Sequence, residues 1–204
     1  MKRYCIALLF LIFVIQPVSA ATTILALGDS LTAGYGLDAG HAMPDVLQAA
    51  LHAKGLDIKI INAGVSGDTA AQGAARLDWS LTPDVKAMIV ELGANDALRG
   101  LPPEGVDTAM RQIMNEAKAK NLPVLILGMK APPNLGADYQ TKFDAIFPKL
   151  AVDYGALFYP FYLDGVAADP ALNQADGMHP NDKGVAIIVP KLVPMVEKLV
   201  TKLP

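Results

Sequence analysis

The stretch TILALGDSL, residues 23–31, indicates the fold, because a short apolar run passes directly into a turn that contains a glycine. Further apolar runs follow, and each is typical of a strand buried on both faces of a parallel sheet. The strong runs are Thr23–Leu27, Ile58–Ile61, Val85–Leu92 and Val124–Leu127, and a weaker one, Ala156–Tyr159, suits an edge strand. Helical patterns alternate with these runs, which predicts one doubly wound α/β domain.

The helical patterns differ in clarity. Between the third and fourth runs, apolar residues fall on one helical face at spacings of three and four, namely Val106, Met110, Ile113 and Ala117. We also expect helices over residues 45–54, 138–153 and 185–199. Pro148 predicts a kink in the second of these, and Pro190 and Pro194 obscure the start of the third.

Composition limits the classes of function. The chain has 204 residues, of which 52% are hydrophobic and 18% charged, so it can bury one sizeable core. Seventeen Lys and Arg stand against twenty Asp and Glu, for a net charge of −3. A nucleic-acid partner is therefore not expected, because such proteins normally carry a basic face. No obligate protein partner is evident.

The first twenty residues have the layout of a secretory signal peptide. Lys2 and Arg3 precede an apolar run over residues 6–15, and a small-residue ending leads to Ala20. The run is too short to span a bilayer, although an uncleaved anchor is the alternative. We expect cleavage after Ala20, a periplasmic or secreted domain of residues 21–204, and no stable membrane insertion. Cleavage also removes Cys5, the only cysteine, and with it any disulfide or thiol nucleophile.

Polar motifs follow the predicted strands, at the sheet edge where ligands bind in open parallel sheets. They are GDSL at 28–31, NAGVSGDT at 62–69, GAND at 93–96 and, near the end, DGMHP at 176–180. Ser30 stands on a turn that Gly28 permits, next to backbone N–H groups, as a nucleophile beside an oxyanion site requires. The alternative is that Asp29 or Ser30 only caps a helix.

A serine nucleophile needs a base, and the expected mature chain offers three histidines. His52 lies in a predicted helix and is expected to be solvated, and His41 suits a loop or capping role. His179 stands in a loop with Asp176 three residues earlier. That carboxylate can bind one ring nitrogen while the other takes the serine proton. Gly67 and Asn95 can supply N–H donors to an oxyanion, although each also suits a turn.

Together, these four motifs resemble the blocks of the GDSL/SGNH hydrolase superfamily, in its order and over nearly the whole mature chain. The flanking residues are most similar to its secreted bacterial thioesterases, lysophospholipases and arylesterases. The resemblance implies a flavodoxin-like three-layer α/β/α sandwich with five parallel strands ordered 2-1-3-4-5. It implies Ser30 as nucleophile, His179 as base and then acid, and Asp176 as its orienting partner. The N–H groups of Ser30 and Gly67 and the side chain of Asn95 would form the oxyanion hole, with no metal or organic cofactor.

The expected substrates are short- to medium-chain acyl or aryl esters, with thioesters and lysophospholipids as further candidates. The expected pocket residues lie after the strands: Asp29, Leu98, Leu101, Met129, Pro132, Leu135 and Tyr139. Three alternatives remain. A carbohydrate O-deacetylase is disfavoured by few aromatics and the single Trp79, and a non-enzymatic binding module by the complete set of motifs. A metal-dependent phosphoryl-transfer protein would use Asp29, Asp68, Asp96 and Asp176, but the chain lacks a phosphate-binding loop.

Overall fold

The computed structural model describes residues 21–203. The expected signal peptide, residues 1–20, lies outside this range. Five strands form one sheet in the order β2-β1-β3-β4-β5, and every neighbouring pair is parallel. The strands are β1 (Thr22–Gly28), β2 (Ile58–Gly64), β3 (Val85–Glu91), β4 (Val124–Leu127) and β5 (Leu157–Tyr159). The expected fold class and strand order are thus confirmed.

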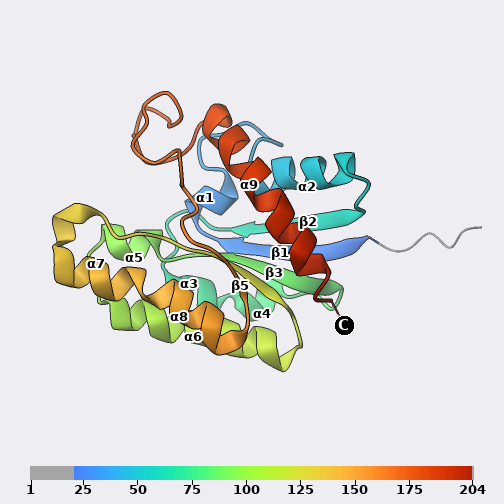
Figure 1. The fold of residues 1–204 in the computed structure, drawn as a ribbon, viewed down its shortest axis with the longest axis horizontal. Coiled ribbons are helices and arrows are strands. Elements are labelled where there is room, and N and C mark those ends of the chain that lie inside the picture. Colours follow the sequence, from blue (N-terminus) through green and yellow to red (C-terminus); the bar gives the residue numbers. More distant parts are fainter. Residues whose placement is uncertain (1–20, 204) are drawn as a thin grey trace, which may run out of the picture.

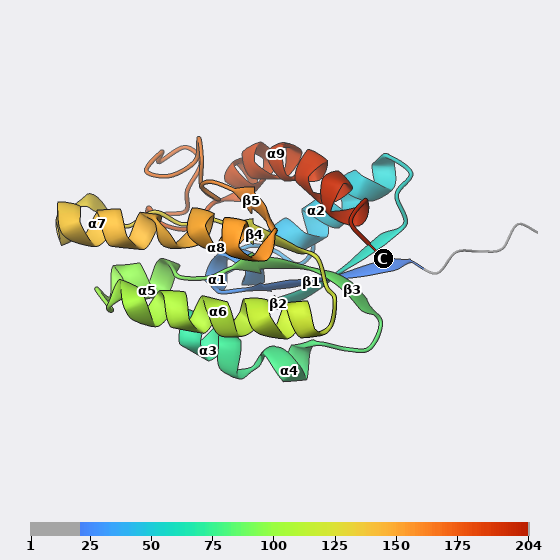
Figure 2. The ribbon, with the colours of Figure 1, turned by 60° about the horizontal axis from the view of Figure 1, so that its bottom comes forward.

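Helices cover both faces of the sheet and make the three layers (Figures 1 and 2). On one face α2 (Met43–Ala53) packs beside α9 (Asp182–Val200), and on the other α6 (Pro103–Ala119) packs between α3 (Ala70–Ala75) and α8 (Ile146–Tyr154). Shorter elements complete the chain: α1 (Ser30–Ala33), α4 (Leu77–Ser80), α5 (Ala94–Leu98), η1 (Pro133–Leu135) and α7 (Ala137–Asp144). Among residues 21–203, none of the helices is both long and apolar enough to cross a bilayer.

Burial explains which strands are apolar throughout. Strands β1, β3 and β4 lie inside the sheet, and nearly all their residues are buried. Strand β2 is an edge strand and exposes Lys59 and Asn62, so it is less buried than its apolar start suggested. The predicted apolar face of α6 is confirmed, because the four residues that defined it, Val106, Met110, Ile113 and Ala117, are all buried.

The two expected helices that contain prolines differ from the prediction in the structure. The segment 138–153 is not one kinked helix, because it divides at Ala145 into α7 and α8. Pro148 then falls in the first turn of α8, where its missing N–H leaves no helical bond unmade. Helix α9 instead continues through Pro190 and Pro194, and both prolines are exposed, so water can satisfy the carbonyl groups that they leave free.

Candidate active site

Ser30 is the first residue of α1, and Asp29 alone separates it from the end of β1. Asp29 caps this helix, and its Oδ1 accepts a hydrogen bond from Leu31 N at 3.0 Å. The two interpretations of this turn are therefore compatible, because Asp29 is the cap and Ser30 is left to face the cleft. Gly28 is needed here for space and not for an unusual backbone angle. A Cβ at this position would overlap the Thr32 hydroxyl and lie 2.8 Å from Glu91 Oε2.

The loop after β5 brings a histidine and an aspartate to this serine. His179 Nε2 lies 2.9 Å from Ser30 Oγ, although the two residues are 149 positions apart. The other ring nitrogen, Nδ1, lies 2.6 Å from Asp176 Oδ2. Asp176 Oδ1 accepts the backbone N–H groups of His179 and Met178. These bonds, together with the histidine side chain, lower the pKa of Asp176 to about 2, so this carboxylate stays ionised at neutral pH.

Two residues that the motifs did not single out hold the histidine loop in place. The ring of Tyr35 lies against the imidazole of His179, with 4.8 Å between the ring centroids. Gln174 Nε2 donates to Tyr35 O at 2.7 Å and to Pro180 O at 3.0 Å. Gln174 thereby ties the loop that follows α1 to the loop that carries Asp176 and His179. Nothing in the local sequence of Gln174 predicts this contact.

Hydrogen-bond donors surround the space in front of Ser30. Within residues 21–203, the backbone N–H groups of Ser30 and Gly67 donate to no other group. Gly67 has φ +88°, which favours glycine, and Arg99 Nη2 donates to its carbonyl at 2.8 Å. Asn95 Nδ2 donates to Asp29 Oδ2 and to Asp68 O, both at 3.1 Å. Since both amide protons have acceptors here, a substrate oxygen would have to share one of them.

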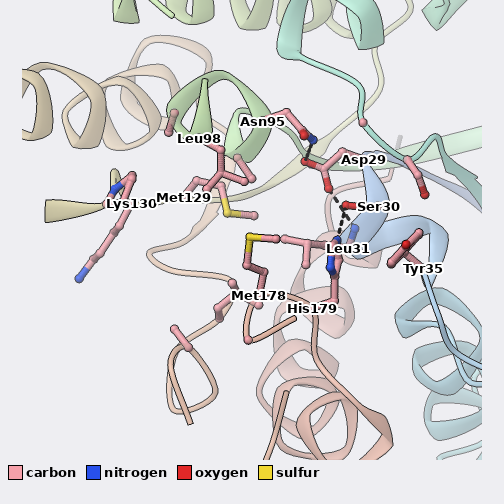
Figure 3. Close-up of a pocket in the computed structure, with 18 of the residues that line it drawn as sticks. Asp29, Ser30, Leu31, Tyr35, Asn95, Leu98, Met129, Lys130, Met178 and His179 are labelled. Atoms are coloured by element: carbon pink, nitrogen blue, oxygen red, sulfur yellow. Dashed lines mark hydrogen bonds between the residues drawn. The ribbon is translucent and has the colours of Figure 1, made fainter. Parts of the chain in front are cut away.

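A cavity of about 380 Å³ opens beside Ser30 and His179, with mainly apolar walls (Figure 3). Of the expected pocket residues, it is lined by Asp29, Leu98, Met129 and Pro132. The wall also includes residues that were not expected in the pocket, among them Leu31, Tyr35, Ala97, Lys130, Phe161, Leu163, Ala168 and Met178. Several of these follow β5, which the sequence marked only weakly, yet the rule that ligands bind beyond the carboxyl ends of strands applies to β5 as well.

Three expected pocket residues lie outside this cavity, which corrects the prediction for them. Tyr139 Oη donates to Leu101 O at 2.7 Å, and the Tyr139 ring stacks on Phe143. Leu135 packs near Gly100. Helix α5 ends at Leu98, and the chain then turns through Gly100, which has φ +61°. Leu101 follows that turn, and it meets Tyr139 outside the cavity.

The four aspartates of the phosphoryl-transfer alternative have separate partners. Asp29 caps α1, Asp68 pairs with Arg76, Asp96 Oδ2 accepts Ala70 N at 2.8 Å, and Asp176 binds His179. Across residues 21–203, no three His, Cys, Asp or Glu side chains are grouped so as to hold a metal ion. His41 contacts Asp182, and His52 contacts Ile58 O, so both lie away from the cleft.

Comparison with known proteins identifies the family of this chain. Residues 26–187 match the GDSL-like Lipase/Acylhydrolase family. The chain belongs to this family. The chain is also similar to Thioesterase 1/protease 1/lysophospholipase L1 of Escherichia coli (strain K12), with 37% identity over 199 residues, or 97% of this chain and 94% of that protein. The resemblance inferred from the four motifs, and with it a hydrolase of this family, is confirmed.

Solved structures of the family are also similar. AlinE4, an SGNH-hydrolase family esterase, has 46% sequence identity and a TM-score of 0.75, over 88% of this chain and 97% of that one. Structures of AlinE4 with a serine or an aspartate changed to alanine match about equally well. The psychrotrophic esterase EstA from Pseudoalteromonas sp., in a structure inhibited by monoethylphosphonate, has 32% identity and a TM-score of 0.83, over 88% and 99% of the two chains.

Proposed function

We propose that this chain hydrolyses carboxylic esters of apolar acyl groups, with Ser30 as the nucleophile. The observation that carries the proposal is the continuous line of contacts from Ser30 Oγ through His179 to Asp176, at the head of an apolar cavity. A serine at hydrogen-bond distance from a histidine that a carboxylate orients is the arrangement of an activated nucleophile.

In this mechanism Ser30 Oγ attacks the acyl carbonyl carbon while His179 Nε2 takes its proton. The ionised Asp176 keeps the ring proton on Nδ1 and stabilises the imidazolium that forms. His179 then gives the proton to the leaving group, which departs and leaves an acyl ester on Ser30. Water attacks that ester with the same histidine as base, and Ser30 regains its proton as the acid product leaves.

The negative charge on the substrate oxygen is stabilised by donors that are already in place. The N–H groups of Ser30 and Gly67 have no other acceptor among the described residues, and the amide of Asn95 lies beside them. One oxyanion donor typically contributes about 3 kcal/mol to transition-state stabilisation. The three donors come from the start of α1, from the loop after β2 and from α5.

The cavity walls favour an acyl chain as the group that is recognised. Leu98, Met129 and Met178 gather on one side of Ser30, whereas Lys130 points away from it (Figure 3). An apolar wall with few polar groups suits a short to medium acyl or aryl group. The names of the relatives support thioesters and lysophospholipids as further substrates, since these share the acyl part and differ in the leaving group.

A series of p-nitrophenyl esters from acetate to palmitate tests the proposal. Wild-type protein should cleave some of these esters, while Ser30→Ala should lose turnover and labelling by a fluorophosphonate. Ser80→Ala is the matched control, because Ser80 donates to Arg76 O and does not line the cavity. Cleavage should persist in EDTA. Turnover that Ser30→Ala retains would overturn the assignment of the nucleophile.

We also propose that the chain is exported and cleaved after Ala20. The support is the sequence of residues 1–20, with its basic start, apolar run and small-residue ending. Sequencing the N-terminus of protein from a periplasmic fraction would test this. A mature chain that begins at Ala21 is the expected result, and protein found only in the cytoplasm with Met1 retained would contradict it.

A further inference from the structure

Glu91 is a buried acid that the proposed mechanism does not use. It ends β3, beneath the turn that carries Ser30, and none of its surface is exposed. Its Oε2 accepts the Thr32 hydroxyl at 2.8 Å and Asp29 N at 3.3 Å. Its Oε1 has no hydrogen-bond partner in the described part of the chain. An ionised carboxylate oxygen that is buried without a hydrogen-bond partner destabilises the folded state. If the carboxyl group is protonated, it carries an O–H group that can donate a hydrogen bond.

A second carboxyl group, that of Asp29, belongs to the residue whose N–H Glu91 Oε2 accepts, and it is also fully buried. The other titratable groups that act on this pair are the buried phenol of Tyr162 and, next to Asp29, His179. No ion pair within residues 21–203 includes either acid. Two adjacent buried carboxyl groups without a cation do not both ionise, so the pair holds one proton.

Burial and hydrogen bonds together favour the proton on Glu91. Burial raises the pKa of both groups, and the charge on Asp29 raises that of Glu91 further, well above its usual value. Hydrogen bonds from Leu31 N, Glu91 and the amide of Asn95 oppose this effect at Asp29, because they stabilise its ionised form. Glu91 is therefore the neutral acid and Asp29 the carboxylate.

We propose that Glu91 is a positioning residue, which donates its proton to Asp29 and so keeps that carboxylate ionised to hold the amide of Asn95. The inference rests on the proposed function, because Asn95 matters only as an oxyanion donor. The line of contacts runs from Glu91 to Asp29 and then from Asp29 Oδ2 to Asn95 Nδ2. The same carboxyl group fastens Thr32 and the backbone of Asp29, so it also fixes the turn on which Ser30 stands.

Two substitutions of Glu91 test whether its side chain acts as a neutral acid or as a carboxylate. In Glu91→Gln the amide oxygen still accepts from Thr32 and Asp29 N, and its NH₂ group donates to Asp29. In Glu91→Leu both functions are lost at similar volume. We expect Glu91→Gln to keep kcat within about threefold of wild type and Glu91→Leu to lower kcat about 10- to 100-fold with KM nearly unchanged, below the loss of a whole oxyanion donor. Glu91→Gln falling as far as Glu91→Leu would overturn the proposal, as would wild-type kcat in folded Glu91→Leu.

A second measurement needs no activity and stands even if Glu91→Leu does not fold. Since the folded-state pKa of Glu91 is raised, wild type should lose stability as pH rises from about 4.5 toward that pKa, and Glu91→Gln should not. The urea midpoint of Glu91→Gln should therefore rise relative to wild type with increasing pH. In the infrared spectrum at neutral pH, wild type should show a protonated carboxyl band that Glu91→Gln lacks.

Parallel urea midpoints across this pH range, or an infrared band that persists in Glu91→Gln, would show that Glu91 does not carry the proton. Failure of the proposed function is visible separately, as turnover retained by Ser30→Ala, and it leaves the stability and infrared results valid for the protonation of Glu91.

Discussion

Replacing Asp176 by asparagine tests the acid–base pair most directly. The asparagine Oδ1 can still accept the backbone N–H groups of Met178 and His179, so the loop should keep its shape. Its Nδ2 would then face His179 Nδ1 as a donor. The ring proton would move to Nε2, which lies 2.9 Å from Ser30 Oγ and could no longer take the serine proton.

The size of the effect follows from how buried the pair is. In a serine protease whose aspartate is buried, the corresponding change lowers kcat about 10⁴-fold. Here 31% of the Asp176 side chain is exposed, so water can replace part of its interaction with the imidazolium. We therefore expect kcat to fall by about 10² to 10⁴, which corresponds to a loss of roughly 3–5 kcal/mol of transition-state stabilisation.

Steady-state kinetics on the best p-nitrophenyl ester would measure this loss. KM should change little, because Asp176 does not line the cavity. The matched control is Asp182→Asn, since Asp182 Oδ1 lies 3.0 Å from Nδ1 of His41, an exposed pair with the same chemistry away from the cleft. A kcat for Asp176→Asn within tenfold of wild type, or an equal loss in Asp182→Asn, would refute the role assigned to Asp176.

Three further predictions concern specificity, packing and acid stability. Leu98→Ala should shift the preferred ester chain length, measured across the p-nitrophenyl series, because Leu98 lines the cavity. Leu101→Ala should leave this preference unchanged, because Leu101 does not line the cavity. Gly28→Ala should lower the free energy of unfolding by about 1–3 kcal/mol in urea titrations, because its Cβ overlaps Thr32, whereas Gly105→Ala in α6 has open space and should not be destabilising. The folded-state pKa of Asp176 is depressed, so the stability that its ionised form contributes, measured against Asp176→Asn, should be present above about pH 4 and lost as pH falls through about 2.

The sequence predicted the fold because buried parallel strands leave a strong signal. Runs such as residues 23–27 and 124–127 are apolar on both faces, and no other common element needs that pattern at that length. The positions of Ser30, Asn95 and His179 at one sheet edge follow from the same topology, since the carboxyl ends of parallel strands lie together.

The cavity wall was predicted less well, because it depends on where loops go after they leave the sheet. Leu98 and Leu101 are three residues apart and chemically alike, yet the turn at Gly100 separates them. Glu91 lay within the predicted apolar run Val85–Leu92 and was given no role. It is held beneath Ser30 by a contact with Thr32, which is 59 residues away in the sequence. Polar contacts between residues so far apart leave no pattern in the local sequence, so they could not be predicted from it.

The contact between Ser30 and His179 has a consequence for when the protein first becomes active. Translation produces the serine and its turn early, but the histidine 149 residues later and helix α9 after it. A growing chain can pair β1 with β2 and β3 long before the base exists to activate the hydroxyl. Hydrolysis therefore requires the last loop, and a chain that stops short of it would lack the histidine that contacts Ser30.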